Sequence, residues 1–257
     1  MASARCEGVG RAVGRGGECN RLGFCGLMAA GVVLGGCLGA AGEAVRIVPV
    51  GYGRFDLPMS WILPGGSGEE RFPIVLGFHL LQVGRRLLLA DVGCDRFVLE
   101  GREAVDFVRP VEALRRLGVE PAAIEACLIS HAHEDHIGAI GSFPRARVYI
   151  QEDEARAAGR LLEGRQVTTF REGLELFGGR LRMVRVGGHT RGSSVLLAPD
   201  CERGKIAVIA GDAVYSRLNL SRRLPTPTTQ NPVESRAFIE TYCTPRHRVY
   251  LCHDFLS

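Results

Sequence analysis

Short apolar segments of the length and spacing of β-strands alternate with helical segments from residue 45 to the end of the sequence. Gly84 separates two of the strand-like segments, and this arrangement predicts a β-hairpin. Strands interleaved with helices are typical of layered α/β folds. The predicted strands are residues 45–50, 73–83, 85–92, 124–129, 147–151, 181–186, 193–198, 206–210 and 249–252.

Four segments carry the signals of helices. Residues 110–118 begin with a proline and end with a glycine, and Pro232 opens a helix over residues 233–242. Residues 137–142 and 152–163 are the other two. Residues 51–73 and 217–231, rich in turn-forming residues, are expected to be loops, and Trp61 in the first loop lines an apolar substrate wall or packs on the core.

A cluster of three histidines and two acids, His-Ala-His-Glu-Asp-His, occupies residues 131–136, directly after an apolar strand. Neutral imidazole and carboxylate are the ligands that Zn²⁺, Fe and Mn²⁺ accept. The alternative is a solvated, histidine-rich turn, but the H-x-H-x-D-H spacing at the end of a strand favours metal binding.

Three further residues are each the first ligand type beyond a short apolar run: His189, Asp212 and His253. Gly188 and Gly211 precede the first two of them. Singly, either histidine could be a hydrogen-bonded structural residue. Because ligands gather where strands end in layered α/β folds, we expect all three to join the histidine cluster.

These motifs, in this order, resemble those of the metallo-β-lactamase superfamily of hydrolases, over roughly residues 45–257. The resemblance implies an α/β fold, a four-layer αβ/βα sandwich with a dinuclear metal site at one edge. Carried over to this sequence, the implied ligands are His131, His133 and His189 for the first metal, Asp135, His136 and His253 for the second, and Asp212 as a bridge between them.

The ligand types agree with two divalent metal ions, with Zn²⁺ as the first choice and Fe, Mn and Co as alternatives. Asp91, in Asp91-Val92-Gly93, matches an early aspartate of the superfamily that supports a ligand histidine. Its alternative role is to form the turn before Gly93.

A tyrosine three residues after Asp212 resembles the N-acyl-homoserine lactonase branch, in which it points at the substrate carbonyl. The resemblance implies a small-molecule hydrolase that opens a lactone ring, with Tyr215 and Asp135 in catalytic roles and a quorum-sensing lactone as substrate. Alternatively, Tyr215 packs against the sheet. A glyoxalase II-like thioesterase, another ester or β-lactam hydrolase, and a non-catalytic metal or redox protein are the other candidates.

Composition narrows the class of partner. The 257 residues are 46% hydrophobic, enough for one large core, and the formal net charge is only +4. No basic run exceeds two residues, and basic and aromatic residues are not interleaved, which disfavours a nucleic-acid partner.

Residues 1–44 differ from the rest of the chain. Several arginines precede an apolar, small-residue stretch over residues 22–41, the order of an export signal. Leu34-Gly35-Gly36-Cys37 resembles a bacterial lipobox, which implies a lipidated Cys37 and an exported, membrane-attached lipoprotein whose hydrolase domain spans residues 45–257. The alternatives are an uncleaved anchor helix and a misassigned start codon ahead of a cytoplasmic enzyme.

Five of the nine cysteines lie beyond residue 44. Cys127 and Cys252 stand in apolar runs and are expected to be buried in the core, Cys252 facing away from the neighbouring His253. The pairing of Cys94, Cys201 and Cys243 stays open, because no C-x-x-C pair exists among them.

Overall fold

The computed structural model of the chain describes residues 45–200 and 204–254. The predicted export signal, the lipobox with Cys37, and Cys201 all lie outside these residues. Within the two described ranges, no helix is long and apolar enough to cross a membrane.

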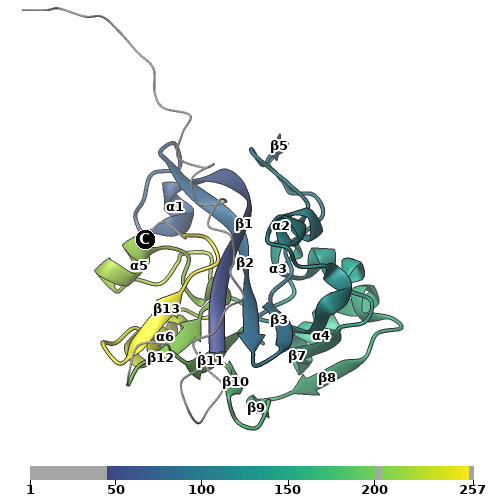
Figure 1. Cartoon of the computed structure of the whole chain (residues 1–257). Helices are drawn as coiled ribbons and strands as arrows, with labels where there is room; N and C mark the ends of the chain where they lie inside the picture. The colour runs from purple at the N-terminus through teal and green to yellow at the C-terminus, as the bar shows by residue number, and fades with distance from the viewer. Residues whose placement is uncertain (1–44, 201–203, 255–257) are drawn as a thin grey trace, which may run out of the picture. The chain divides into compact units, whose positions relative to one another are not determined.

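Two sheets form the centre of the domain (Figure 1). Strands β3, β6, β7 and β8 are mutually parallel, as are β12 and β13. The six-stranded sheet has the order β1 (Val45–Pro58), β2 (Arg71–Val83), β3 (Arg86–Ala90), β6 (Ile124–Ile129), β7 (Arg147–Gln151) and β8 (Val167–Phe170). The five-stranded sheet has the order β13 (His247–Tyr250), β12 (Ile206–Ile209), β11 (Ser194–Pro199), β10 (Leu181–Arg185) and β9 (Gly173–Leu176). A separate ribbon pairs β4 (Val98–Leu99) with β5 (Arg102–Glu103).

The helices are short. Pro110 opens α2 and Pro232 opens α6, as predicted, because proline lacks the N–H that the first turn of a helix leaves unbonded. The α-helices are α1 (Met59–Ile62), α2 (Pro110–Arg116), α3 (Glu134–Ile137), α4 (Glu152–Ala158), α5 (Arg217–Arg222) and α6 (Pro232–Tyr242). Single 3₁₀ turns are η1 (Pro121–Ala123), η2 (Gly138–Ser142), η3 (Gly159–Leu162) and η4 (Gly211–Ala213).

Side-chain alternation along the strands creates the layers. Leu88 of β3 packs in the apolar cluster between the two sheets, whereas the adjacent Leu89 packs with Leu114 of α2 on the opposite face. In the second sheet, Val208 of β12 packs outward against Phe238 of α6. The order is therefore helix, sheet, sheet, helix, which confirms the predicted αβ/βα sandwich (Figure 1).

The predicted loop at residues 51–73 is wrong at both of its ends. β1 continues to Pro58 and pairs with β2 as far as Arg71, with an irregularity between Gly51 and Gly53. The glycines and prolines in this segment are typical of loops, so the sequence pattern did not indicate a strand. β1 is an edge strand, where one side of the backbone needs no partner and proline is tolerated.

The predicted loop at residues 217–231 is wrong at its start, because α5 occupies its first six residues. The Ser216 side chain accepts a hydrogen bond from the Asn219 backbone N–H, and the Asn219 side chain accepts one from the Ser216 backbone N–H. This reciprocal cap starts the helix without a long apolar pattern. The predicted helix at residues 152–163 ends earlier, with α4 at Ala158, and turns at Gly159 into η3.

Candidate metal centre

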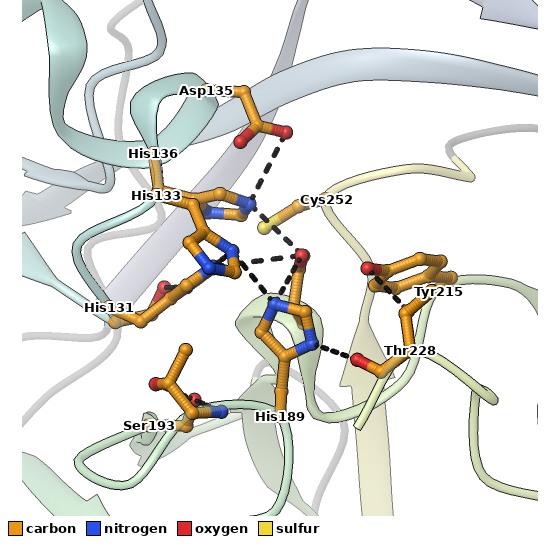
Figure 2. A network of polar contacts seen from close by, with 12 residues as sticks. His131, His133, Asp135, His136, His189, Ser193, Tyr215, Thr228 and Cys252 are labelled. Carbon is orange, nitrogen blue, oxygen red and sulfur yellow. Dashed lines mark hydrogen bonds and ion pairs between the residues drawn. The ribbon is translucent and has the colours of Figure 1, made fainter. Parts of the chain in front are cut away.

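The site residues follow the ends of strands from both sheets. His131 comes two residues after β6, His189 follows β10, Asp212 follows β12, and His253 follows β13. Figure 2 shows the rings of His131, His133, His136 and His189 directed toward one another. The structure therefore brings together residues up to 122 positions apart, at the strand ends where the sequence predicted them.

Three histidines and one carboxylate oxygen form the first ligand set. His133 Nδ1 lies 3.1 Å from His131 Nε2 and 3.0 Å from His189 Nε2. Asp212 Oδ2 lies 3.6 Å from His131 Nε2 and 3.3 Å from His189 Nε2. In a tetrahedral site with metal–ligand distances of about 2.0–2.1 Å, ligand atoms lie ~3.3 Å apart, so these four atoms fit one Zn²⁺-sized ion.

The second ligand set shares Asp212 with the first. Asp212 Oδ1 lies 3.0 Å from His136 Nε2 and 3.1 Å from His253 Nε2. Asp135 Oδ2 lies 3.8 Å and 3.7 Å from the same two nitrogens. The two oxygens of Asp212 thus face different sets, which is the geometry of a carboxylate that bridges two cations.

Four of the five histidines have one ring nitrogen bonded away from the site. That nitrogen is Nδ1 in each case, so the neutral ring keeps the lone pair of Nε2 for the site. The partners are the Ser130 hydroxyl for His131, the Thr228 carbonyl for His189, Asp91 Oδ2 for His136 and the Val75 carbonyl for His253, at 2.8–3.0 Å.

Two buried atoms at the centre are left without a hydrogen bond. His136 Nε2 and Asp212 Oδ1 lie 3.0 Å apart, yet the angles between them are not those of a hydrogen bond. Buried polar atoms in native proteins nearly always have partners. A ring nitrogen and a carboxylate oxygen that face a common point without the geometry of a hydrogen bond indicate a cation site.

Electrostatics differ between the histidines of the cluster. Burial opposes the charge of His136 and His253, but Asp212 and the neighbouring carboxylates outweigh it and raise the pKa of both rings. Burial lowers the pKa of His131 well below its ordinary value and also lowers the pKa of His189, so both rings are neutral at pH 7. Burial opposes ionisation of Asp212 too, but His136 and the other histidines outweigh it and hold its pKa well below the usual range. Neutral imidazole and ionised carboxylate are the forms that bind metal.

Gly188 allows the loop that carries His189 to pack closely against α6. It has φ +82°, and a Cβ there would lie 2.4 Å from Ser235 Oγ. Glycine alone combines that backbone conformation with so close an approach. Gly211 before Asp212 also has a positive φ, +51°, and a Cβ would meet Ser130 at 2.8 Å. The glycines noted in the sequence thus position the ligands that follow them.

Asp91 supports the cluster from behind. One oxygen accepts from His136 Nδ1 at 2.8 Å and from the Ser130 hydroxyl at 2.9 Å, and the other accepts from the Ser130 N–H at 2.8 Å. Asp91 has φ +59°, but residues 91–94 form no regular turn, so the observed role of Asp91 is support of the cluster. Cys252 is buried as expected, but it does not face away: its Sγ lies 3.9 Å from Asp91 Oδ2, because β13 has already ended at Tyr250.

Tyr215 lies at the edge of the cluster, 8% exposed, with its ring 5.8 Å from that of His189 and 5.3 Å from that of His253. The Thr228 hydroxyl donates to the Tyr215 oxygen at 2.9 Å (Figure 2). Burial and then the charge of Asp212 raise the pKa of Tyr215 well above its ordinary value, so the phenol stays protonated. The Tyr215 proton is therefore left to donate toward Asp212 and the site.

A cavity of about 470 Å³ opens onto both ligand sets. One wall is apolar, and Trp61 both lines it and packs on the core. The segment of residues 227–230 also lines the cavity. The apolar wall consists of Leu57, Trp61, Ile74, Phe97 and Leu99.

Two residues at the site were not predicted from the sequence. Thr228 lies in the predicted loop and contacts His189 through its carbonyl and Tyr215 through its hydroxyl. Glu154 was only one residue of the helix predicted over 152–163, yet it is 3% exposed and hydrogen-bonded to the loops that carry the ligands. His79, in contrast, is buried in β2 and is in neither ligand set.

The chain resembles known proteins in both sequence and fold. The family model of the metallo-beta-lactamase superfamily matches residues 79–241. "Metallo-beta-lactamase domain-containing protein 1" of Xenopus laevis is 31% identical over an alignment of 141 residues that covers 48% of this chain and 58% of the relative. An N-acyl homoserine lactonase of Bacillus sp is 27% identical over 125 residues, 46% of this chain and 49% of that protein. The matches thus span about half the length of these curated relatives.

Solved structures share the architecture. A quorum-quenching N-acyl homoserine lactone lactonase superposes with a TM-score of 0.71 at 20% identity, over 84% of this chain and 95% of that one. The dizinc quorum-quenching lactonase AidC, solved with a product, has a TM-score of 0.63 at 17% identity, over 83% and 88% of the two chains. At these identities the likeness establishes the fold. Together with the family match over more than half of the sequence, it shows that this chain belongs to the metallo-beta-lactamase superfamily.

Proposed function

We propose that this protein is a metal-dependent hydrolase that opens lactone rings and that N-acyl homoserine lactones are its substrates. The two ligand sets that share Asp212 support a dinuclear hydrolase, with Zn²⁺ as the proposed metal. The lactonases among the similar sequences and structures support the substrate class. The observation that carries the proposal is the position of the Tyr215 hydroxyl beside both sets.

Tyr215 is suited to stabilise a developing oxyanion. Its phenol is nearly buried, its oxygen already accepts a hydrogen bond from the Thr228 hydroxyl, and its own proton is available on the side of the site. A preformed donor aimed at the position of a carbonyl oxygen lowers the barrier of acyl transfer because it needs no reorganisation during the reaction.

The cavity suits an amphipathic lactone. Such a substrate has a polar ring and amide at one end and an apolar acyl chain at the other. Trp61 and Phe97 give the cavity an apolar lining beside the ligand sets, and Thr229 and Gln230 add polar groups to it. We place the ring over the ligand sets and the acyl chain along the apolar wall.

The proposed reaction is the addition of water to the lactone carbonyl, followed by breakage of the ring C–O bond to give a hydroxy acid. Bound divalent cations supply Lewis acidity, which polarises a carbonyl and makes water nucleophilic near neutral pH. The half-buried Asp135 carboxylate faces the cavity and can carry one proton from the attacking water to the ring oxygen as that bond breaks. Tyr215 holds the carbonyl oxygen meanwhile.

A substrate panel tests the proposal. The Zn²⁺-loaded full-length protein is assayed with homoserine lactones of short and long acyl chains, a glutathione thioester, a simple aryl ester and a β-lactam. We expect the highest kcat/KM for the lactones, with a preference for longer chains because each buried methylene adds about 0.8 kcal/mol. Faster turnover of the thioester or β-lactam than of every lactone would overturn the assignment of substrate while leaving the hydrolase class intact.

A further inference from the structure

Glu154 is a buried carboxylate that takes no part in the proposed reaction. It lies on α4 and is 3% exposed. Its Oε2 accepts from the Ala132 N–H at 2.8 Å, and its Oε1 accepts from the Thr190 hydroxyl at 2.7 Å and the Gly192 N–H at 2.8 Å. All three donors belong to the two loops that carry His131, His133 and His189.

These contacts join loops from different sheets. Ala132 lies between two ligands in the loop after β6, and Thr190 directly follows His189 in the loop after β10. A carboxylate accepts hydrogen bonds on both oxygens, so one side chain can bind both loops at once. The loop of Gly192 approaches so closely that a Cβ there would lie 2.9 Å from Glu154 Oε1 and 2.2 Å from Gln151 Oε1.

The two ligand sets differ in how much of each lies on these loops, because Asp135 and His136 of the second set follow on α3, beyond Ala132. The loops that Glu154 holds supply all three imidazoles of the first set. The second set is held by other groups: His253 Nδ1 donates to the Val75 carbonyl, and the Tyr52 hydroxyl donates to the Asp135 carbonyl at 3.2 Å. A change at Glu154 should therefore affect the two sets unequally.

We propose that Glu154 is a positioning residue that sets the metal affinity of the first set by fixing the His131–His133 loop against the His189 loop. Partners behind metal ligands typically contribute about 10–100-fold to metal affinity, because the ligands must otherwise be ordered when the metal binds. The inference rests on the two ligand sets and does not depend on which substrate is hydrolysed.

Single-set variants of the full chain make this testable with Zn²⁺ alone. His253→Ala retains all ligands of the first set, and His189→Ala retains all ligands of the second. Glu154→Gln is added to each, since glutamine keeps the shape but presents an NH₂ group where a donor now binds. Zn²⁺ affinity is measured by competition with a chromogenic chelator.

The proposal predicts that Glu154→Gln weakens Zn²⁺ binding about 10–100-fold in the His253→Ala background and less than about threefold in the His189→Ala background. Equal weakening in both backgrounds would make Glu154 a general structural residue and overturn the proposal. Unchanged affinity in both would overturn it as well.

A milder pair of variants covers the case in which Glu154→Gln fails to fold. Thr190→Val removes one donor to Glu154 and keeps the side-chain shape, whereas Thr190→Ser restores the hydroxyl. In the His253→Ala background we expect Thr190→Val to weaken Zn²⁺ binding by about 3–10-fold and Thr190→Ser to bind as the parent does. Loss of thermal stability without this difference in affinity would contradict a positioning role. Tyr52→Phe serves as the matched control, because it removes a buried hydroxyl behind Asp135 and should leave the first set unchanged.

Discussion

The Tyr215→Phe variant tests whether the Tyr215 hydroxyl stabilises the oxyanion during lactone hydrolysis. If the protein is a metal-dependent hydrolase that does not use this hydroxyl, the variant should be as active as the wild type. The change removes one oxygen and keeps the ring that packs between His189 and His253. The fold and both ligand sets should therefore survive. Thr228 loses its acceptor, at a cost of about 0.5–1.5 kcal/mol, and because it lines the cavity, water can replace that bond.

The size of the kinetic effect follows from the number of groups that share the oxyanion. Removal of one donor from an oxyanion site typically lowers kcat by about 10²–10³-fold. Here a bound cation would carry part of the charge, so we expect a decrease of about 10–100-fold in kcat/KM for lactones, equivalent to about 1.4–2.7 kcal/mol.

The assay compares kcat/KM and metal content for the wild type, Tyr215→Phe and a control, Tyr242→Phe. Tyr242 ends α6, and its ring packs against Phe238 and His247 outside the cavity lining, so its hydroxyl should be irrelevant to turnover. If Tyr215→Phe carries full metal and turns over lactones within twofold of the wild type, Tyr215 is a packing residue and the main reason for choosing lactones is lost.

Three further predictions concern other parts of the chain. Thr228→Val keeps the carbonyl that binds His189 but removes the donor to Tyr215, so lactone turnover should fall about 3–10-fold with metal content unchanged, and Thr228→Ser should restore it. Burial lowers the pKa of His79 to about 4. Between about pH 6.5 and 4, His79 is therefore protonated in the unfolded chain but neutral in the folded chain. Stability should therefore be lost as the pH falls from 6.5 to 4, by about 3 kcal/mol from this group, and urea unfolding of His79→Leu should show a shallower decline than the wild type. From the sequence alone we propose that Cys37 is lipidated; mass spectrometry of the native N-terminus should find it acylated, and Cys37→Ser should abolish partitioning into detergent, whereas residues upstream of Cys37 on the mature protein would contradict the lipobox.

The sequence predicted which residues gather at the candidate site because their signals are local. His131, His189 and His253 each come soon after an apolar strand, and the strand ends of an α/β sandwich meet at one edge, so short motifs were enough to place distant residues together. The buried strands and the proline-capped α2 and α6 were predicted for the same reason.

What the sequence did not predict depends on contacts between distant segments. β1 extends to Pro58 because β2 offers a partner along its whole length, and no periodicity in residues 51–58 indicates this. The role of Glu154 arises where α4 lies against two loops of separate strands, and nothing in Glu152-Asp153-Glu154 distinguishes the third acid from its neighbours. Thr228 likewise gains its role only where its loop passes His189.

A metal count on the purified full-length protein is the most direct test of the proposed two-metal site. After equilibration with Zn²⁺ and removal of the excess, we expect about two equivalents of Zn²⁺ per chain, because seven ligand residues form two sets that share Asp212. Asp212→Ala should lose metal and hydrolytic activity together. A protein that holds no transition metal and hydrolyses its substrate at an unchanged rate in the presence of a strong chelator would contradict the account.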